Sequence, residues 1–280
     1  MTKAKILQEL CAIDLSRISF PKLMDILLNQ ISSFPLLEID IKKGSVIERG
    51  RINEAESLYM SEREITIRDD FQNIKHFGRA HIPFRPVFYG SMISDDLEYP
   101  RYTILTELSE RFRKGEDFEI AFTVGRWRVK RDFVACSFLY SDQYQEIERI
   151  NKLIREWNKK LDENKDLDRD ELKRIGMLIS DEFAKSEIRS NDDYKISAAM
   201  SEIIYKAGKA DAILYPGVRS DYKGLNIAIK GGSVIDLLEL EKVALFKANI
   251  INKKGDLNMT AIAEGLGPFN TEFKWIPVNN

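Results

Sequence analysis

Histidine and cysteine are scarce in this chain, which has two of each among 280 residues. His76 and His81 are expected in one loop with no candidate nucleophile beside them, so a zinc or iron centre has no evident ligand set. Cys11 and Cys136 are too few for a disulfide framework and fit a reducing cytoplasm. No apolar run is long enough to span a bilayer or serve as a signal peptide. We therefore expect a cytoplasmic protein with no metal and no membrane contact.

Neither sign of charge dominates, because 43 basic residues face 45 acidic ones and the formal net charge is −2. No overall field attracts nucleic acid or an anionic membrane, so direct binding to either is not expected. An anionic substrate must then be met by a local cluster of arginines. The sequence also lacks the GxGxxG, Walker and GxSxG motifs, which argues against a Rossmann dinucleotide site, a P-loop NTPase and an α/β-hydrolase.

Helical and strand-like patterns are interspersed, without the regular strand–helix alternation of a doubly wound sheet. This predicts an α+β fold with a mixed β-sheet and surrounding helices. Residues 3–40 have apolar side chains at helical spacing, so we expect residues 1–40 to form a helical extension packed on the core. Residues 41–280 form the main domain, since no repeat or linker divides them.

Several segments are patterned clearly enough to place individual elements. Apolar or alternating runs predict strands at residues 45–51, 86–89, 118–129, 133–139, 212–215, 226–229, 234–238 and 243–250. Apolar stripes at a helical period predict helices at residues 101–113, 145–190 (in two pieces) and 194–207. Gly125 interrupts one strand and predicts a bend or bulge there.

Three residues of different types suit one particular chemistry. Arg79 lies in an expected loop, Tyr89 ends the apolar run PVFY, and Glu107 lies in the next helix. A guanidinium binds two phosphate oxygens at once, an aromatic ring packs on a flat heterocycle, and a carboxylate stabilises positive charge on a ribose. We expect the three side chains to surround one dinucleotide-sized hollow, with Arg49 and Arg51 assisting at a diphosphate.

Each of these residues also has an ordinary structural explanation when it is taken alone. Arg79 suits a surface ion pair, Tyr89 suits the end of a core strand, and Glu107 suits the border of an apolar helix face. The basic segment 125–131 (GRWRVKR) is expected on the solvent side of a strand. The functional interpretation therefore depends on the three residues occurring together.

The order and spacing of these motifs resemble those of the RES-domain family, named for an arginine, a glutamate and a serine. Its members include the toxins of Xre–RES toxin–antitoxin pairs. The matching positions are Gly78–Arg79, the step Pro86–Tyr89, and Glu107. The strand segment IERGR, Tyr194 at a helix start, and the segment AILYPGVRSDYKGLNIAI also match. The resemblance covers residues 45–240.

The resemblance implies a fold related to ADP-ribosyltransferases, NAD+ as substrate and cleavage of the nicotinamide–ribose bond. Nicotinamide leaves as a neutral molecule, so no general acid is required and the scarcity of histidine is acceptable. The resemblance also implies an Xre-type antitoxin as partner, and a homo-oligomer is left open. The implied catalytic residues are Arg79, Tyr89 and Glu107, and the implied NAD-binding residues are Arg79, Tyr89, Arg49, Arg51, Ser220 and Asn226.

Three positions depart from the family pattern. Gly217 stands where the family's serine directly follows Tyr-Pro, and Ser220 lies three residues farther on. His81 stands where the family commonly has asparagine. The tyrosine-to-glutamate spacing is longer than usual, which leaves Glu98 and Glu110 as alternative counterparts of the family glutamate.

The sequence thus predicts an NAD+-degrading enzyme, a glycohydrolase or phosphorylase, acting as the toxin of a toxin–antitoxin pair. Two alternatives stay open. Gly217 in place of serine favours a RES-like binding protein without catalysis. The same fold would also support a protein ADP-ribosyltransferase.

Overall fold

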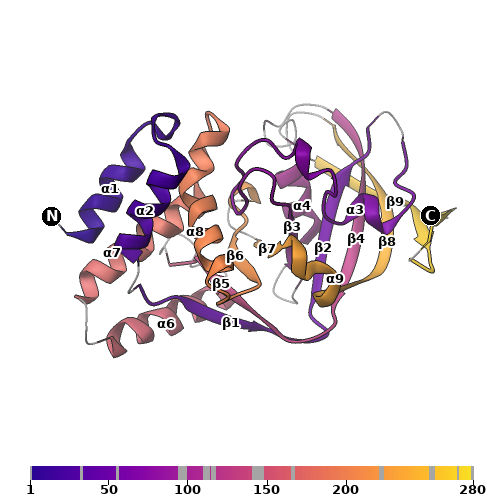
Figure 1. Ribbon diagram of the computed structural model, residues 1–280. Coiled ribbons are helices and arrows are strands. Elements are labelled where there is room, and N and C mark those ends of the chain that lie inside the picture. The colour runs from indigo at the N-terminus through magenta and orange to yellow at the C-terminus, as the bar shows by residue number, and fades with distance from the viewer. Residues whose placement is uncertain are drawn as a thin grey trace.

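The computed structural model describes residues 2–31, 34–54, 57–93, 100–109, 114, 118–140, 148–164, 168–220, 224–251, 256–269 and 271–278. Within these residues the chain has an α+β fold, in which a ten-stranded mixed sheet is accompanied by helices. Helices α1, α2, α6, α7 and α8 gather at the end of the molecule that carries the N-terminus (Figure 1). The long strands β4, β8 and β9 lie at the other end, near the C-terminus.

The strands follow one another across the sheet in the order β1-β5-β6-β7-β3-β2-β4-β8-β9-β10. Neighbouring strands are antiparallel except for the parallel pair β5 and β6. Strands β7, β3 and β2 are adjacent, so residues from three distant parts of the sequence meet there. The bounds are β1 Leu37–Ile41, β2 Val46–Ile52, β3 Val87–Ile93, β4 Phe118–Val129, β5 Phe133–Ser137, β6 Ala212–Pro216, β7 Leu225–Lys230, β8 Leu238–Ile251, β9 Asp256–Leu266 and β10 Lys274–Pro277.

Strand β4 shows how the sequence pattern determines the register. Trp127 is fully buried, whereas Arg126 and Arg128 on either side of it form ion pairs on the opposite face. The pairing of β4 with β8 shifts between Arg126 and Trp127, next to the predicted irregularity at Gly125. A Cβ at Gly125 would lie 2.3 Å from the Trp127 ring, so the glycine makes room for the indole. The predicted strand at 118–129 is confirmed.

The longer helices bury apolar stripes against the sheet. Helix α7 begins after Asp168, whose side chain accepts a hydrogen bond from the Glu171 N–H, and α8 is followed by Gly208 at φ +66°. The bounds are α1 Lys3–Ala12, α2 Phe20–Ile31, α4 Pro100–Leu108, α6 Glu148–Glu163, α7 Arg169–Ala184 and α8 Lys195–Lys206, with the single-turn helices α3 Glu62–Ile65 and α9 Val234–Leu237. The two helices predicted within 145–190 are confirmed as α6 and α7, although α7 ends at Ala184, six residues before the predicted end, and the helix predicted at 194–207 is confirmed as α8.

The N-terminal helices share the core of the main domain. Helix α1 packs on α7 and helix α2 packs on α8, and Leu7, Leu23 and Leu27 are buried in the same cluster as the sheet residues. The buried ammonium of Lys195 donates to the carbonyls of Leu15 and Ile18. This contact ties the segment after α1 to the start of α8.

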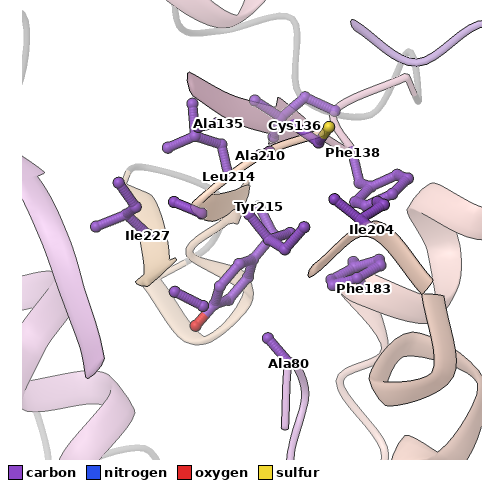
Figure 2. Packing of buried hydrophobic residues seen from close by; sticks show 14 of the residues in the cluster. Ala80, Ala135, Cys136, Phe138, Phe183, Ile204, Ala210, Leu214, Tyr215 and Ile227 are labelled. Carbon is purple, nitrogen blue, oxygen red and sulfur yellow. The ribbon is translucent and has the colours of Figure 1, made fainter. Parts of the chain in front are cut away.

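Aromatic packing anchors the centre of the fold. Figure 2 shows the rings of Phe138 and Phe183 stacked, with Tyr215 of β6 alongside. The Phe138 and Phe183 centroids are 4.5 Å apart. Ala80, from the turn before β3, reaches the same cluster and is almost fully buried. The turn that carries Arg79 is therefore fixed to the core.

Two predicted elements were wrong. Residues 37–40 were expected to be helical but lie in β1, Leu37–Ile41, which pairs with β5, so a strand of the sheet begins inside the predicted extension. Residues 234–238 were expected to be a strand, but Val234–Leu237 form α9. Strand β3 runs four residues beyond the predicted end at Tyr89. Of the helix predicted at 101–113, residues 110–113 lie outside the described residues.

Candidate functional site

One cavity of about 540 Å³ brings together six of the seven residues implied by the sequence. We call it the arginine cavity. Strand β2 contributes two of its arginines, the turn before β3 a third, and α4 the glutamate. The implied residues that line it are Arg49, Arg51, Arg79, Tyr89, Glu107 and Asn226, and the further lining residues used below are Glu54, Tyr59, Arg68, Ser91, Tyr194, Tyr215 and Arg219.

Arg49 lies on the cavity wall, and its hydrogen bonds among the described residues all go to main-chain carbonyls. Its Nε donates to the Ile65 carbonyl at 3.2 Å, and a terminal nitrogen donates to the Tyr89 carbonyl at 2.7 Å. Its guanidinium carbon lies 5.2 Å from the centre of the Phe88 ring. Burial, with a smaller effect of Arg51, lowers the pKa of Arg49 to about 9, so the group is charged at neutral pH.

Arg51, two residues farther along β2, points to the same face and donates to the Thr66 carbonyl at 3.0 Å. Glu48, beside Arg49 in sequence, also lines the cavity, but its carboxylate pairs with Arg126 at 2.9 Å and with Arg101 at 3.3 Å. This carboxylate is thus engaged by two arginines that do not line the cavity, and it forms no ion pair with Arg49 or Arg51. Arg68 also lines the cavity, but Asp70 neutralises it through two hydrogen bonds.

Arg79 is presented by a tight turn between Gly78 and His81, whose main chains bond to each other at 3.0 and 3.3 Å. Its guanidinium donates to the carbonyls of Phe183 and Lys185, where α7 ends. Its carbon also lies 5.3 Å from the centre of the Tyr194 ring. Two of its five N–H groups are therefore used by the helix end, and no acceptor for the other three lies among the described residues.

Arg49, Arg51 and Arg79 share one property that sets the chemistry of the cavity. Among the described residues none of them has a carboxylate within ion-pair distance. Three guanidinium charges that are not neutralised, in a partly buried site, favour a ligand with at least two negative charges.

The Tyr89 hydroxyl is already bound on both sides. It accepts the Ala80 N–H at 2.9 Å and lies 2.8 Å from Nδ1 of His81. Burial lowers the pKa of His81 to about 4, so at neutral pH its uncharged ring accepts the tyrosine O–H. A ligand therefore meets the ring of Tyr89, while the hydroxyl fixes the turn that carries Arg79.

Glu107 is oriented by a chain of polar side chains from two strands. Ser91 on β3 donates to the Asn226 carbonyl oxygen at 2.9 Å, and the Asn226 amide donates to Oε1 of Glu107 at 3.1 Å. Arg219 Nε lies 3.8 Å from Oε2. Ser91 and Asn226 are buried, whereas the Glu107 side chain is 32% exposed. The carboxylate is thus fixed in direction yet accessible from the cavity.

Gly50 on β2 allows α4 to approach the sheet and bring Glu107 to the cavity. A Cβ at Gly50 would lie 2.4 Å from Ile104 and 2.8 Å from Leu108. Any larger residue would push α4, and with it the carboxylate, away from the arginines.

The structure places Ser220 away from the cavity lining. Its side chain is fully buried and donates to the Gly217 carbonyl at 2.8 Å. A Cβ at Gly217 would lie 2.7 Å from this hydroxyl and 3.1 Å from Thr103. A serine at position 217 would therefore need local rearrangement, and Ser220 does not offer its hydroxyl to a ligand. Glu98 and Glu110 lie outside the described residues.

Sequence reasoning missed several lining residues. Tyr59, Tyr194 and Tyr215 give the cavity three further aromatic rings, and Arg219 faces the glutamate. Tyr194 was noted as a helix start, but its contact with Arg79 depends on the fold. Burial and the charges of Tyr89 and Glu107 raise the pKa of Tyr215 well above its usual value, so its phenol is neutral.

No family model matches this chain, and no curated protein matches its sequence. No group of three histidine, cysteine, aspartate or glutamate side chains in the described part of the chain could hold a metal ion. No helix in that part is long and apolar enough to span a membrane. The chemistry of the site therefore has to be argued from its own residues.

Proposed function

We propose that this chain is an NAD+-consuming enzyme that breaks the bond between nicotinamide and ribose. The observation that carries the proposal is the meeting of Arg79, Tyr89 and Glu107 in one cavity with three unneutralised guanidinium groups. A diphosphate supplies the missing charge, and tyrosine rings suit flat bases. The volume of about 540 Å³ falls among those of small-molecule sites, about 300–1,000 Å³.

The reaction would need little acid–base chemistry from the protein. When the bond between ribose C1′ and the nicotinamide nitrogen breaks, its electron pair neutralises the pyridinium ring, and positive charge develops on the ribose. Glu107, oriented by Asn226, would stabilise that charge. Arg49, Arg51 and the free side of Arg79 would hold the diphosphate, and an acceptor oxygen would then bond to C1′ and lose its proton.

The proposal also includes a fold relation, a biological role and a partner protein. An ADP-ribosyltransferase-like fold, a toxin role in the cytoplasm and an Xre-type antitoxin partner follow from the resemblance to RES domains. Water, phosphate and a protein side chain are the candidate acceptors, and the last would make the chain a protein ADP-ribosyltransferase.

One observation favours a second candidate, a RES-like protein that binds the dinucleotide without cleaving it. Position 217 has no side chain, and the nearby Ser220 hydroxyl is buried and bonded to the main chain. No hydroxyl at this position therefore reaches the ligand.

Nicotinamide release from NAD+ by the purified chain, with water, with phosphate and with cell extract, tests both candidates. Release that depends on Glu107 supports the enzyme, and label transferred from NAD+ to an extract protein would identify the protein-modifying form. ADP-ribose binding without release supports the second candidate. If neither release nor binding is observed, both fail.

A further inference from the structure

A second hollow lies behind the wall of the arginine cavity. It has a volume of about 1170 Å³ and is bounded by α3, α9 and the loop at residues 268–272. We call it the glutamate groove. Residues 59–68, the wall segment, separate the two hollows. Tyr59 and Arg68 at its ends line the cavity, and residues between them line the groove.

The floor of the groove is apolar, and so is the residue that α9 exposes at one side of it. Trp127 and Leu240 are buried at the floor, and Ile235 on α9 is 79% exposed at the edge. The buried indole N–H of Trp127 faces the Glu62 carboxylate and favours its charged form. The apolar floor and the exposed isoleucine beside it together offer apolar surface that a partner segment could cover.

The rim of the groove carries negative charge that is not neutralised. Glu62, Glu239 and Glu272 line it and have no ion-pair partner in the described part of the chain. Of the lining cations, Arg63 pairs with Asp69, whereas Lys130 keeps its charge because its ammonium donates only to a main-chain carbonyl, so three carboxylates surround one unpaired ammonium among the described residues. Burial raises the pKa of Glu62; the charge of Lys130 opposes the rise, and that of Glu239 adds to it. A positively charged occupant would relieve this repulsion.

We infer that the glutamate groove is a docking surface for a basic, amphipathic segment of a partner protein, and that docking regulates the arginine cavity. Apolar side chains of the segment would cover Trp127 and Ile235, and its lysines or arginines would pair with the rim glutamates. The docking part is independent of the proposed function. The regulatory part requires only that the cavity binds a polyphosphate.

The wall segment provides the physical connection. Ile65 is buried, and both Ile65 and Trp127 lie against Gly125, while the Ile65 carbonyl holds Arg49. Thr66 lines the groove, and its carbonyl holds Arg51. An occupant that shifts these two residues changes the carbonyl groups that position two of the cavity arginines.

Docking can be measured by calorimetry with a leucine–lysine peptide that presents the two residue types on opposite faces of a helix. The double variant Glu239→Gln/Glu272→Gln should weaken binding about tenfold, since two exposed ion pairs are lost. The matched control Glu9→Gln/Glu156→Gln removes the same charge from exposed positions on α1 and α6, and should stay within about twofold. Ile235→Asp should also weaken binding.

Equal affinity for the groove and control variants, or equal binding of a leucine–glutamate peptide, would overturn docking. So would sedimentation showing a dimer that Ile235→Asp dissociates, because the occupant would then be a second copy. Regulation is judged by pyrophosphate affinity with and without the leucine–lysine peptide, and we expect a change of about threefold or more. If the peptide leaves the pyrophosphate affinity unchanged, or if pyrophosphate does not bind, the regulatory part of the proposal is wrong. The docking part is then judged by the peptide titrations alone.

Discussion

The arginine cavity and the glutamate groove lie on opposite sides of one short segment and carry opposite charge. On the cavity side Arg49, Arg51 and Arg79 have only carbonyl partners. On the groove side Glu62 and Glu239 have no ion-pair partner among the described residues. On the open surface, by contrast, Lys42 pairs with Asp132. Charge that a fold leaves unneutralised in a hollow is thus the most direct indication of what the hollow binds.

The same two regions differ in how firmly their side chains are held. The cavity groups are fixed by hydrogen bonds, as in the chain from Ser91 through Asn226 to Glu107. At the groove, Ile235 and Glu239 are exposed. Pre-organised groups suit a small ligand and a reaction, whereas exposed side chains beside an apolar floor suit a protein segment.

The largest expected effect is the loss of nicotinamide release when Glu107, and not another acidic residue of the cavity, is replaced. Glu107→Gln keeps the shape but removes the charge beside the ribose, so nicotinamide release should fall about 100-fold. ADP-ribose affinity should change little, which calorimetry checks. Glu54→Gln, at an exposed carboxylate of the same cavity, serves as the control. An equal loss in both variants would show that net charge, and not the position of Glu107, controls the rate.

Anion binding should stabilise the protein through the cavity and not through the groove. At 100 times its Kd, pyrophosphate should raise the free energy of unfolding by about 2.7 kcal/mol. Thermal unfolding of wild type and of Arg49→Met/Arg51→Met measures this. We expect the shift to disappear in the double variant and to persist in Glu239→Gln/Glu272→Gln. A shift that survives loss of both arginines would place the anion elsewhere.

A methyl group added at one glycine beside each hollow should destabilise the protein to different extents, because the two glycines differ in the space around them. Gly50→Ala would drive a methyl group into Ile104 and Leu108 of α4, and should cost about 1–3 kcal/mol of stability. Gly232→Ala, beside the groove, meets nothing within 4 Å and should change stability by less than about 0.5 kcal/mol. Chemical denaturation gives both values. Similar costs at the two positions would contradict the close approach of α4 to β2.

The smallest effects are opposite dependences of stability on pH. Because the folded pKa of His81 is lowered to about 4, the unfolded chain binds the proton first, and stability falls as pH drops from about 6.5 to 4. The folded pKa of Glu62 is raised, so its contribution is present below the unfolded pKa and is lost as pH rises. His81→Gln should flatten the first slope, and Glu62→Gln should flatten the second. Unfolding curves measured across this pH range test both expectations. Unchanged slopes in both variants would show that His81 and Glu62 do not cause the pH dependence of stability.

The sequence predicts some of these features and not others, for physical reasons. Long strands such as 118–129, and apolar stripes that run over several turns, as in α7, repeat often enough to define their period. Residues 37–41 do not, because their two buried residues are four apart, a spacing that also fits a helix. Residues 234–238 form an apolar run too short to separate a helical turn from a strand.

Some residues of the candidate site could likewise be predicted from the sequence, and others could not. The motif order leads to Arg79, Tyr89 and Glu107, which line one cavity. Ser220 was expected there and is buried away from it, because its distance from a ligand depends on how the chain turns after Pro216. One of the two carbonyls that hold Arg49, that of Ile65, comes from a segment with no periodic pattern, so no sequence rule could supply it.

A calorimetric titration of ADP-ribose into wild type and Arg51→Met is the most direct test that the arginine cavity holds a dinucleotide. We expect one site in the wild type and an affinity about tenfold weaker in the variant, which loses one charge-assisted phosphate contact. No heat with the wild type, or equal affinities in the two proteins, would contradict this.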